Sequence, residues 1–436
     1  MKAATPDVFR PPVIAERPTN ARGVVVLFAV SLAVLQYIDR VAISQAAPLV
    51  MKDLALSKEQ MSWVFSAFTL AYALFEIPGG YLGDRIGPRR VLLRIVLWWS
   101  FFTAATGWAV NHASLVAARF LFGAGEAGCF PNLTKAMKRW LPIQERSRAQ
   151  GIMWTSARWG GAVTPLIVYA CLLVMTWRQA FMVFGALGVA WAVVFAWWYR
   201  DDPRTHPHVN SAEAAILPVA NASDTQHDPI PWRRMLTSIT VWCLCGQYAA
   251  LSYAWYFFVT WFPTYLLEER GFDLGQSALL AGTPLLLGGC GSLLAGWITP
   301  VLSRKWGVGP TRRFLGMAGM TGAAVCLVAS TAVANPYMAV VLIALVSFSM
   351  DLTMPGSWTT CMDIGGHATA TLGGAMNMMG NLGGFLSPIV LGMIVSQTGN
   401  WTMTFYVTSV VCLSGAIMWF FIDPITPLEQ GAVHEA

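Results

Sequence analysis

Charged residues are scarce in this sequence. Asp, Glu, Lys and Arg together make up 11% of the 436 residues, whereas hydrophobic residues make up 56%. A soluble globular domain carries about 25% charged residues, so the composition excludes that class. We expect the lipid bilayer to be the solvent of the chain. We interpret the formal net charge of +6 as a property of loops that face lipid headgroups, with no nucleic acid as partner.

The sequence also lacks the motifs of several kinds of chemistry. It contains no G-x-x-x-x-G-K-[ST] run for binding nucleotides, and neither a metal-ligand cluster nor a nucleophile-base spacing indicates an enzyme. The eight cysteines fall inside apolar runs without ligand-like spacing and are predicted to be buried free thiols. The first 21 residues show no signal peptide. We therefore expect a carrier with no catalytic residues, no metal and no other cofactor.

Long apolar runs recur along the chain. Each is close to the roughly 20 residues that a helix needs to cross the hydrocarbon core. A polar linker at 201–236 separates six runs in residues 22–200 from six in residues 237–422, between tails at 1–21 and 423–436. The predicted fold class is an all-α membrane protein with twelve transmembrane helices in two six-helix halves. The expected spans are 22–46, 60–83, 90–110, 113–137, 146–172, 177–199, 238–267, 275–302, 311–331, 336–361, 366–397 and 400–421.

The basic residues predict the orientation of these spans. Cytoplasmic loops of membrane proteins collect Lys and Arg. One set of loops, with the N-terminal tail, holds most of the cations outside the spans, including Lys135 and Lys138, while the opposite set holds only Lys52, Lys58, Arg178 and Arg270. Both termini are therefore predicted to be cytoplasmic.

A basic motif follows the second span of each half. Residues 80–90 read GYLGDRIGPRR, and residues 296–298 and 303–307 read GWI and SRKWG, with two more arginines at 312 and 313. Paired halves with a site at their midplane interface are typical of a rocking transporter. Two interpretations of Asp84 and Arg85 stay open. They belong to a charge network that locks the cytoplasmic ends of the halves together in one state, or they reflect positive-inside topology alone.

Four charged residues lie within two of the apolar runs. Asp39 and Arg40 share the first run, and Arg119 and Glu126 share the fourth. Charges inside a membrane are costly and mark a functional site by default. The rise of an α-helix places Asp39 and Arg119 at similar depths, so we expect an ion pair between them. Glu126, seven residues after Arg119, returns to the same helix face near the midplane.

Three further charges fall inside spans. Arg158, near the middle of span five, has two interpretations, as a ligand for an anionic substrate or as the counter-ion of a carboxylate such as Asp351. Glu76 in span two and Asp351 in span ten are expected toward the cytoplasmic side, where either could serve an inner gate. The charges of spans one and four also have a purely structural interpretation, in which they form a network that binds no substrate.

Several motifs resemble one family. The run at 80–90 resembles the signature loop of the major facilitator superfamily. GAGEAGCFP at 123–131, followed by WLP at 140–142 and ERSR at 145–148, looks like the fourth-span signature of its anion:cation symporter branch, which includes bacterial carriers of galactonate, hexuronates and glucarate and vesicular carriers of glutamate and sialic acid. YIDR at 37–40, GQY at 246–248, WFP at 261–263 and GNLGG at 380–384 agree with the bacterial members.

This resemblance implies roles for the buried charges. Asp39 and Glu126 are assigned to proton coupling and Arg40 to a substrate carboxylate, which suits its planar pair of donors. The wider set of candidate substrate-binding residues adds Arg158 and the neutral polar groups that would recognise hydroxyls, among which Gln247, Trp358 and Asn377 match substrate-contacting positions of sugar-acid carriers. The neutral candidates are Tyr37, Tyr72, Gln247, Tyr248, Ser357, Trp358, Asn377 and Asn381.

The sequence and the resemblance together predict a monomeric symporter of the bacterial inner membrane. It would import an organic anion, most simply a sugar acid (an aldonate, hexuronate or aldarate), with protons by rocker-switch alternating access. Export or exchange of another organic anion is the alternative within transport. A non-transporting membrane sensor is the alternative of a different class, and it would predict an added cytoplasmic domain or a lost coupling carboxylate.

Overall fold

The computed structural model describes residues 17–218 and 230–428, and these residues fold into α-helices and short 3-10 turns without a strand. The first half contains α1 (Ala21–Asp53), α2 (Lys58–Ile86), α3 (Pro88–Gly107), α4 (His112–Glu126), α5 (Cys129–Trp140), α6 (Ile143–Val174) and α7 (Trp177–Trp198). The second half contains α11 (Ile239–Thr260), α12 (Phe262–Glu268), α13 (Leu274–Leu280), α14 (Thr283–Trp306), α15 (Val308–Ala332), α16 (Pro336–Asp351), α17 (Met354–Ile364), α18 (Thr369–Thr398) and α19 (Trp401–Phe421). The connecting segments contain η1 (Pro203–Thr205), α8 (Ser211–Ile216), α10 (Trp232–Thr237) and η2 (Gly366–Ala368).

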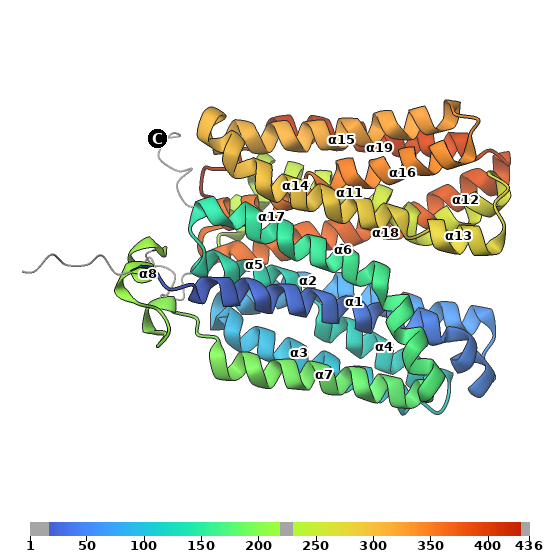
Figure 1. The fold of residues 1–436 in the computed structure, drawn as a ribbon, viewed down its shortest axis with the longest axis horizontal. Helices are drawn as coiled ribbons and strands as arrows, with labels where there is room; N and C mark the ends of the chain where they lie inside the picture. Colours follow the sequence, from blue (N-terminus) through green and yellow to red (C-terminus); the bar gives the residue numbers. More distant parts are fainter. Residues whose placement is uncertain (1–16, 219–229, 429–436) are drawn as a thin grey trace, which may run out of the picture.

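The predicted fold class is confirmed. Nine segments of the described residues are long and apolar enough to cross a membrane, with α4 and α5 counted as one segment and α16 and α17 as another. Helices α2, α3 and α11 complete the twelve predicted spans. Figure 1 shows the two halves as parallel stacks of long helices, with α8 at one end of the bundle. We call this the linker end, where α1 begins and α19 finishes, and we call the opposite end the far end.

The fourth span is broken in its middle. Helix α4 ends at Glu126, and α5 begins at Cys129 after Gly128, whose φ is +80°. Glycine adopts this left-handed conformation without steric cost. A Cβ at Gly128 would also lie 2.7 Å from the Cα of Gly79 on α2, so the break lets two helices approach closely. The sequence predicted a continuous span at 113–137, and the break places Glu126 at a helix end inside the bundle.

Capping boxes begin several helices at the far end. In this motif a side chain at the N-cap accepts a hydrogen bond from the third backbone N–H of the helix, and the side chain at that position returns the bond. The motif satisfies donors that the helix itself leaves free. It is formed by Ser57 with Gln60, Asn111 with Ser114, Thr176 with Gln179 and Asp273 with Gln276.

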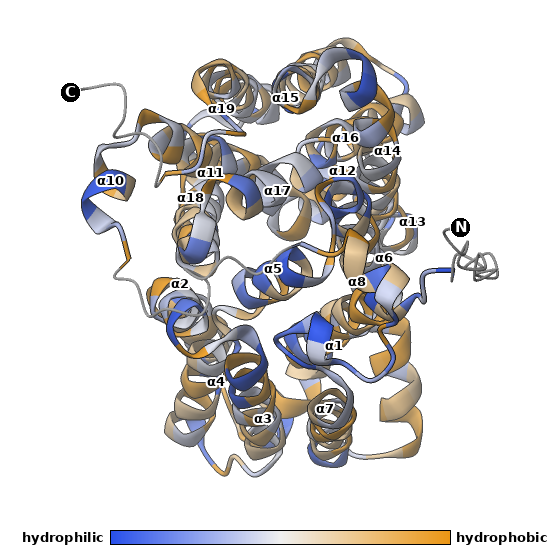
Figure 2. Ribbon diagram, turned by 90° about the vertical axis from the view of Figure 1, so that its left-hand side faces the viewer, coloured by the Kyte–Doolittle hydropathy of each residue, from blue (hydrophilic) through white to orange (hydrophobic). Residues whose placement is uncertain are grey.

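The outer surface of the bundle is apolar. Figure 2, which looks at the linker end, shows hydrophobic residues around the outside of both halves. Large side chains such as Trp197 and Val174 are 75% and 80% exposed. Large exposed apolar surfaces are rare on soluble monomers, so this surface fits a lipid environment.

The two halves pack along two helix pairs, α2 with α18 and α6 with α14. Small residues allow the backbones to touch, as in membrane helix pairs generally. The Cα of Gly151 on α6 would lie 3.0 Å from a Cβ at Gly296 on α14, and Gly374 on α18 faces the backbone of Glu76 on α2. Any side chain at these positions would push the halves apart.

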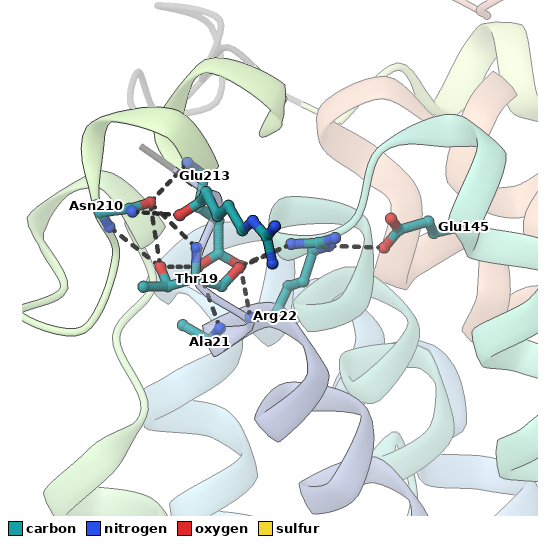
Figure 3. A network of polar contacts seen from close by, with 7 residues as sticks. Thr19, Ala21, Arg22, Glu145, Asn210 and Glu213 are labelled. Atoms are coloured by element: carbon teal, nitrogen blue, oxygen red, sulfur yellow. Dashed lines mark hydrogen bonds and ion pairs between the residues drawn. The ribbon is translucent and has the colours of Figure 1, made fainter. Parts of the chain in front are cut away.

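Glu213 of α8 binds the linker to the start of α1 (Figure 3). We call this set of contacts the clasp. Its buried carboxylate accepts hydrogen bonds from the hydroxyl of Thr19 (2.5 Å), from the backbone N–H groups of Ala21 and Arg22 (both 3.1 Å) and from the guanidinium of Arg22 (3.0 Å). These bonds use donors that the first turn of α1 leaves free. Arg22 also pairs with Glu145 at the start of α6 (2.9 Å).

The clasp is formed at neutral pH. Burial alone would raise the pKa of Glu213, but the hydrogen bonds from Thr19, from the backbone of Arg22 and Ala21 and from the Arg22 side chain outweigh it and lower the pKa. A carboxyl whose pKa is lower in the folded state stabilises that state above its unfolded pKa of about 4.3. This contribution is lost only as the pH falls below that value through the lowered pKa.

Candidate functional site

A cavity lies between the two halves. Its volume is about 60 Å³, below the roughly 300–1,000 Å³ of ligand pockets, so a bound sugar acid would require the helices around it to move apart. The lining includes the predicted residues Tyr37, Arg40, Tyr72, Arg158, Tyr248, Asn377 and Asn381. Sequence reasoning did not select the other lining residues, Phe130, Trp154, Leu251, Ser252, Trp255, Tyr256 and Met354, because aromatic and apolar side chains in spans carry no signal that separates a cavity wall from a lipid face.

Stacked aromatic rings form the floor of the cavity toward the linker end. Phe130 stacks on Trp154 with ring centroids 4.6 Å apart, and Trp154 lies 5.6 Å from Trp358. The indole N–H of Trp358 donates to the hydroxyl of Tyr248 (3.2 Å). Trp358, a predicted substrate-binding residue, is fully buried in this floor and holds a residue of the cavity wall in place.

Two more predicted substrate-binding residues lie behind the cavity wall. The side-chain amide of Gln247 donates to the hydroxyl of Ser357 (3.0 Å) and accepts from the indole of Trp419 (3.2 Å). Both Gln247 and Ser357 are fully buried within the second half. The structure places them as packing partners of α11 and α17, because their hydrogen bonds are satisfied by each other and by α19.

Arg40 forms an ion pair with Glu126 at the edge of the cavity. The distance from Nε of Arg40 to Oε1 of Glu126 is 2.5 Å. The guanidinium lies 4.2 Å from the centre of the Tyr72 ring, a cation–π contact. Glu126 is fully buried, and its second oxygen and Nη2 of Arg40 have no hydrogen-bond partner in the described residues. The two groups that the resemblance assigned to substrate and to protons are therefore each other's counter-ion.

The ion pair predicted between Asp39 and Arg119 is not formed. Both carboxylate oxygens of Asp39 and two guanidinium nitrogens of Arg119 are buried and have no hydrogen-bond partner in the described residues. Arg119 lies over the ring of Phe122, 4.2 Å from its centre. Helix α4 packs mainly on α2 and α3, while α1 packs mainly on α6 and α7. The two charges lie near enough to attract each other, but they do not meet in an ion pair.

Arg158 pairs with Asp351 across the interface between the halves. Two parallel bonds of 2.8 Å join the guanidinium to the carboxylate, and the side chains are 3% and 1% exposed. Of the two interpretations of Arg158, the structure shows the counter-ion. Asp351 ends α16 in the middle of its span, which continues toward the linker end as α17. The expectation that Asp351 lies at the cytoplasmic side is therefore wrong.

Glu76 also joins the halves near the cavity. The side-chain amide of Asn377 on α18 donates to the carboxylate of Glu76 (2.5 Å) and to the hydroxyl of Tyr72 (3.3 Å) on α2. Asn381 donates to the backbone carbonyl of Asn377 (2.8 Å). Glu76 is fully buried, lies one turn from the cavity-lining Tyr72 and is in the half of α2 nearer the linker end. Its role in an inner gate stays a prediction.

A polar network closes the linker end. Asp84 of α2 accepts from Lys135 of α5 (2.6 Å) and, across the interface, from the backbone N–H and hydroxyl of Thr371 (both 2.6 Å) and the N–H of Ala370 (3.1 Å). Lys138 reaches the backbone of η2. Of the two interpretations of Asp84, the structure supports a lock between the halves. In the sequence, the feature that indicated this lock was a single acidic residue, Asp84, within a basic motif.

Arg85 does not belong to this lock. It is exposed and lies over the ring of Tyr81. The cations that do cross the interface, Lys135 and Lys138, were counted with the loop residues by the sequence analysis, but both lie on α5, and Lys135 is buried. Asp363 of α17 completes the closure by pairing with Arg146 of α6 and with Arg312 of α15 (2.6 Å).

Replacing Asp84 by Asn should open the linker end. Hydrogen bonds to a charged group contribute about 1.5–3 kcal/mol each, so weakening those to Thr371 should shift the equilibrium at least about tenfold toward states with separated linker ends. Spin labels at the exposed positions 90 and 305, in a variant without native cysteines, would report this separation. Arg85→Gln, beside the lock but outside it, should leave the distance distribution unchanged. Identical distributions for Asp84→Asn and the wild type would refute the lock.

The family model, the relatives and the solved structure that this chain resembles are all those of transporters. The sequence matches the family model of the Major Facilitator Superfamily over residues 29–388. It is 35% identical to a Cupriavidus necator protein named "Probable sulfoacetate transporter SauU", with 91% of this chain and 92% of the relative covered. It is 30% identical to the hexuronate transporter of Bacillus subtilis, with 94% and 97% covered. The crystal structure of the fucose:proton symporter FucP of E. coli superimposes with a TM-score of 0.69 at 15% identity, covering 92% of this chain and 99% of that one.

Proposed function

The chain belongs to the Major Facilitator Superfamily, and we propose that it is a proton-coupled symporter that imports a small organic anion by alternating access. The Arg40–Glu126 pair in the cavity wall carries this proposal. Its energy source is the proton gradient, so it needs no bound cofactor. The linker end faces the cytoplasm of a bacterial cell, since that end carries most of the basic residues outside the spans.

Coupling follows from competition for one guanidinium. While Glu126 is ionised, it occupies Arg40 at 2.5 Å, and an anionic substrate has to displace it. A proton on Glu126 removes the competing charge and leaves Arg40 as an unpaired cation in a water-poor site, which strongly favours a substrate carboxylate. Proton and anion therefore enter together, and the net charge around Arg40 is the same before and after loading.

Asp39 supplies a second position for a proton. Its carboxylate is fully buried, and in the described residues neither oxygen has a hydrogen-bond partner. Burying an ionised carboxylate without a partner is very costly, so Asp39 is suited to hold a proton while the linker end is closed. It adjoins Arg40 in sequence but does not line the cavity itself.

The neutral groups of the cavity suit a hydroxylated anion. Tyr37, Tyr248 and Asn381 line it beside Arg40 and offer hydroxyl and amide groups for hydrogen bonds. Arg158 is already held by Asp351, which leaves Arg40 as the cation that a single carboxylate would take. These features favour a sugar acid. A small sulfonated acid is the second candidate, because the relative that is 35% identical is named for sulfoacetate.

Uptake into proteoliposomes tests the proposal. Radiolabelled hexuronates, aldonates, aldarates and sulfoacetate would each be offered with an imposed pH gradient that is acid outside. We expect accumulation of at least one of these acids, and we expect a protonophore to abolish it. A gradient of one pH unit sustains about tenfold accumulation for each proton coupled. Uptake that ignores the pH gradient and follows a sodium gradient would contradict proton coupling, and export of the same acids would contradict the direction.

A further inference from the structure

A second, larger cavity lies between α6 and α14 at the linker end. Its volume is about 640 Å³, and it is lined by the first turn and a half of α6, the last three turns of α14 and the start of α15. The two helices touch at Gly151 and Gly296 and leave a crevice between this contact and the linker end. The volume falls within the roughly 300–1,000 Å³ of ligand sites. It is separate from the cavity that contains Arg40.

The polar side of this crevice carries cations without counter-ions. Arg148 and Arg304 line it and are exposed, and no carboxylate pairs with either of them in the described part of the chain. The guanidinium of Arg148 lies 3.6 Å from the centre of the Trp297 ring, which fixes its position against the crevice wall. The one lining acid, Glu145, is paired with Arg22.

Two residues that line the crevice also have buried polar atoms without partners in the described residues. Arg312 is 2% exposed, and its Nε has no hydrogen-bond partner in the described residues although its two terminal nitrogens bind Asp363 and the backbone of Pro424. The buried hydroxyl of Ser303 is also without a partner. Buried donors that find no acceptor are costly, and an anionic oxygen in the crevice would satisfy them.

The other side of the crevice is apolar and open to lipid. Ile143, Trp297 and Val301 line it and are 51%, 50% and 56% exposed. The cations of the crevice could bind an anionic headgroup, and the exposed apolar side chains beside them could contact hydrocarbon tails. A lipid has both parts. Basic pockets between transmembrane helices are suited to such headgroups.

We propose that this crevice binds an anionic phospholipid, with its phosphate between Arg148 and Arg304 and its acyl chains along Trp297 and Val301. The crevice is built from one helix of each half, so its occupant contacts both halves. A ligand that binds one conformation better shifts the equilibrium toward it. The lipid would therefore stabilise the state in which the linker end is closed.

Native mass spectrometry of the full-length protein tests this site. Cardiolipin, phosphatidylethanolamine and inorganic phosphate would be titrated separately. We expect retention of cardiolipin over phosphatidylethanolamine, and about a 30-fold weaker affinity in the Arg148→Gln/Arg304→Gln variant, since each cation near a membrane surface contributes about fivefold. The Arg148→Lys/Arg304→Lys variant should keep most of the affinity.

A matched control separates this site from general charge effects. Arg90→Gln/Arg233→Gln removes two exposed cations at the linker end that do not line the crevice, and its affinity should stay within about twofold of the wild type. Equal loss in the control, equal binding of cardiolipin and phosphatidylethanolamine, or unchanged affinity in Arg148→Gln/Arg304→Gln would overturn the proposal. Displacement of cardiolipin by inorganic phosphate at similar concentration would overturn the assignment to a lipid. These outcomes do not depend on which anion the protein transports.

Discussion

Proteoliposomes that contain Glu126→Gln are expected to lose accumulation of substrate against its gradient while they still exchange labelled for unlabelled substrate. Glutamine keeps the shape of the side chain but can neither ion-pair with Arg40, now at 2.5 Å, nor release a proton. The guanidinium is then permanently available to an anion, so loading no longer requires a proton. The accumulation ratio at one pH unit should fall from about tenfold per proton to about one, whereas counterflow should remain within a few-fold of the wild type.

Other acidic residues provide the controls for this experiment. Glu268→Gln makes the same change at an exposed position of α12 and should transport like the wild type. Arg40→Gln should lose both accumulation and exchange, because the site then has no cation for the substrate. Normal accumulation by Glu126→Gln would remove Glu126 from coupling and leave Asp39 as the candidate proton carrier.

Breaking the Arg158–Asp351 pair is expected to be the most destabilising single change at the interface. Its side chains are 3% and 1% exposed, and removing one partner of a buried pair leaves an uncompensated charge, at a cost of about 3–5 kcal/mol. Asp351→Asn and Arg158→Gln should each lower the thermal midpoint in detergent strongly. The double variant contains no buried charge at this position, so its thermal midpoint should return much of the way to that of the wild type.

An exposed pair gives the matched comparison. Arg178 and Asp53 form an ion pair of similar length (2.9 Å) at the far end, with side chains 33% and 48% exposed. Asp53→Asn should cost no more than about 1 kcal/mol. Single variants of the buried pair that are as stable as Asp53→Asn would show that Arg158 does not need Asp351, and its role as a direct substrate ligand would then regain support.

The sequence predicted which residues are buried charges better than it predicted their partners. Hydropathy places a residue along the membrane normal, so Asp39, Arg119 and Glu126 were assigned to the right spans. The direction of a side chain around its helix depends on which helices cross there and at what angle. For this reason Arg119 lies over Phe122 and does not pair with Asp39, while Arg40 reaches Glu126.

The sequence analysis also misplaced residues where topology and function share one signal. A lysine near the end of a span predicts a cytoplasmic loop, and Lys135 followed that rule while pairing with Asp84 inside the bundle. Gln247 and Ser357 stay predicted substrate-binding residues, and in this structure they bond to each other behind the cavity wall. Distinguishing these cases requires the positions of neighbouring helices.

The clasp between Glu213 and the start of α1 shortens the part of the linker that connects the two halves. Because α8 is fixed to the first half, the number of residues between Ile216 and Trp232 limits the reach from there to at most about 55 Å at roughly 3.4 Å per residue. Release of the clasp would move the first anchored point back to His206, which bonds the backbone of Trp198, and would raise the maximum reach to about 90 Å. The clasp thus limits how far the linker ends of the two halves can separate.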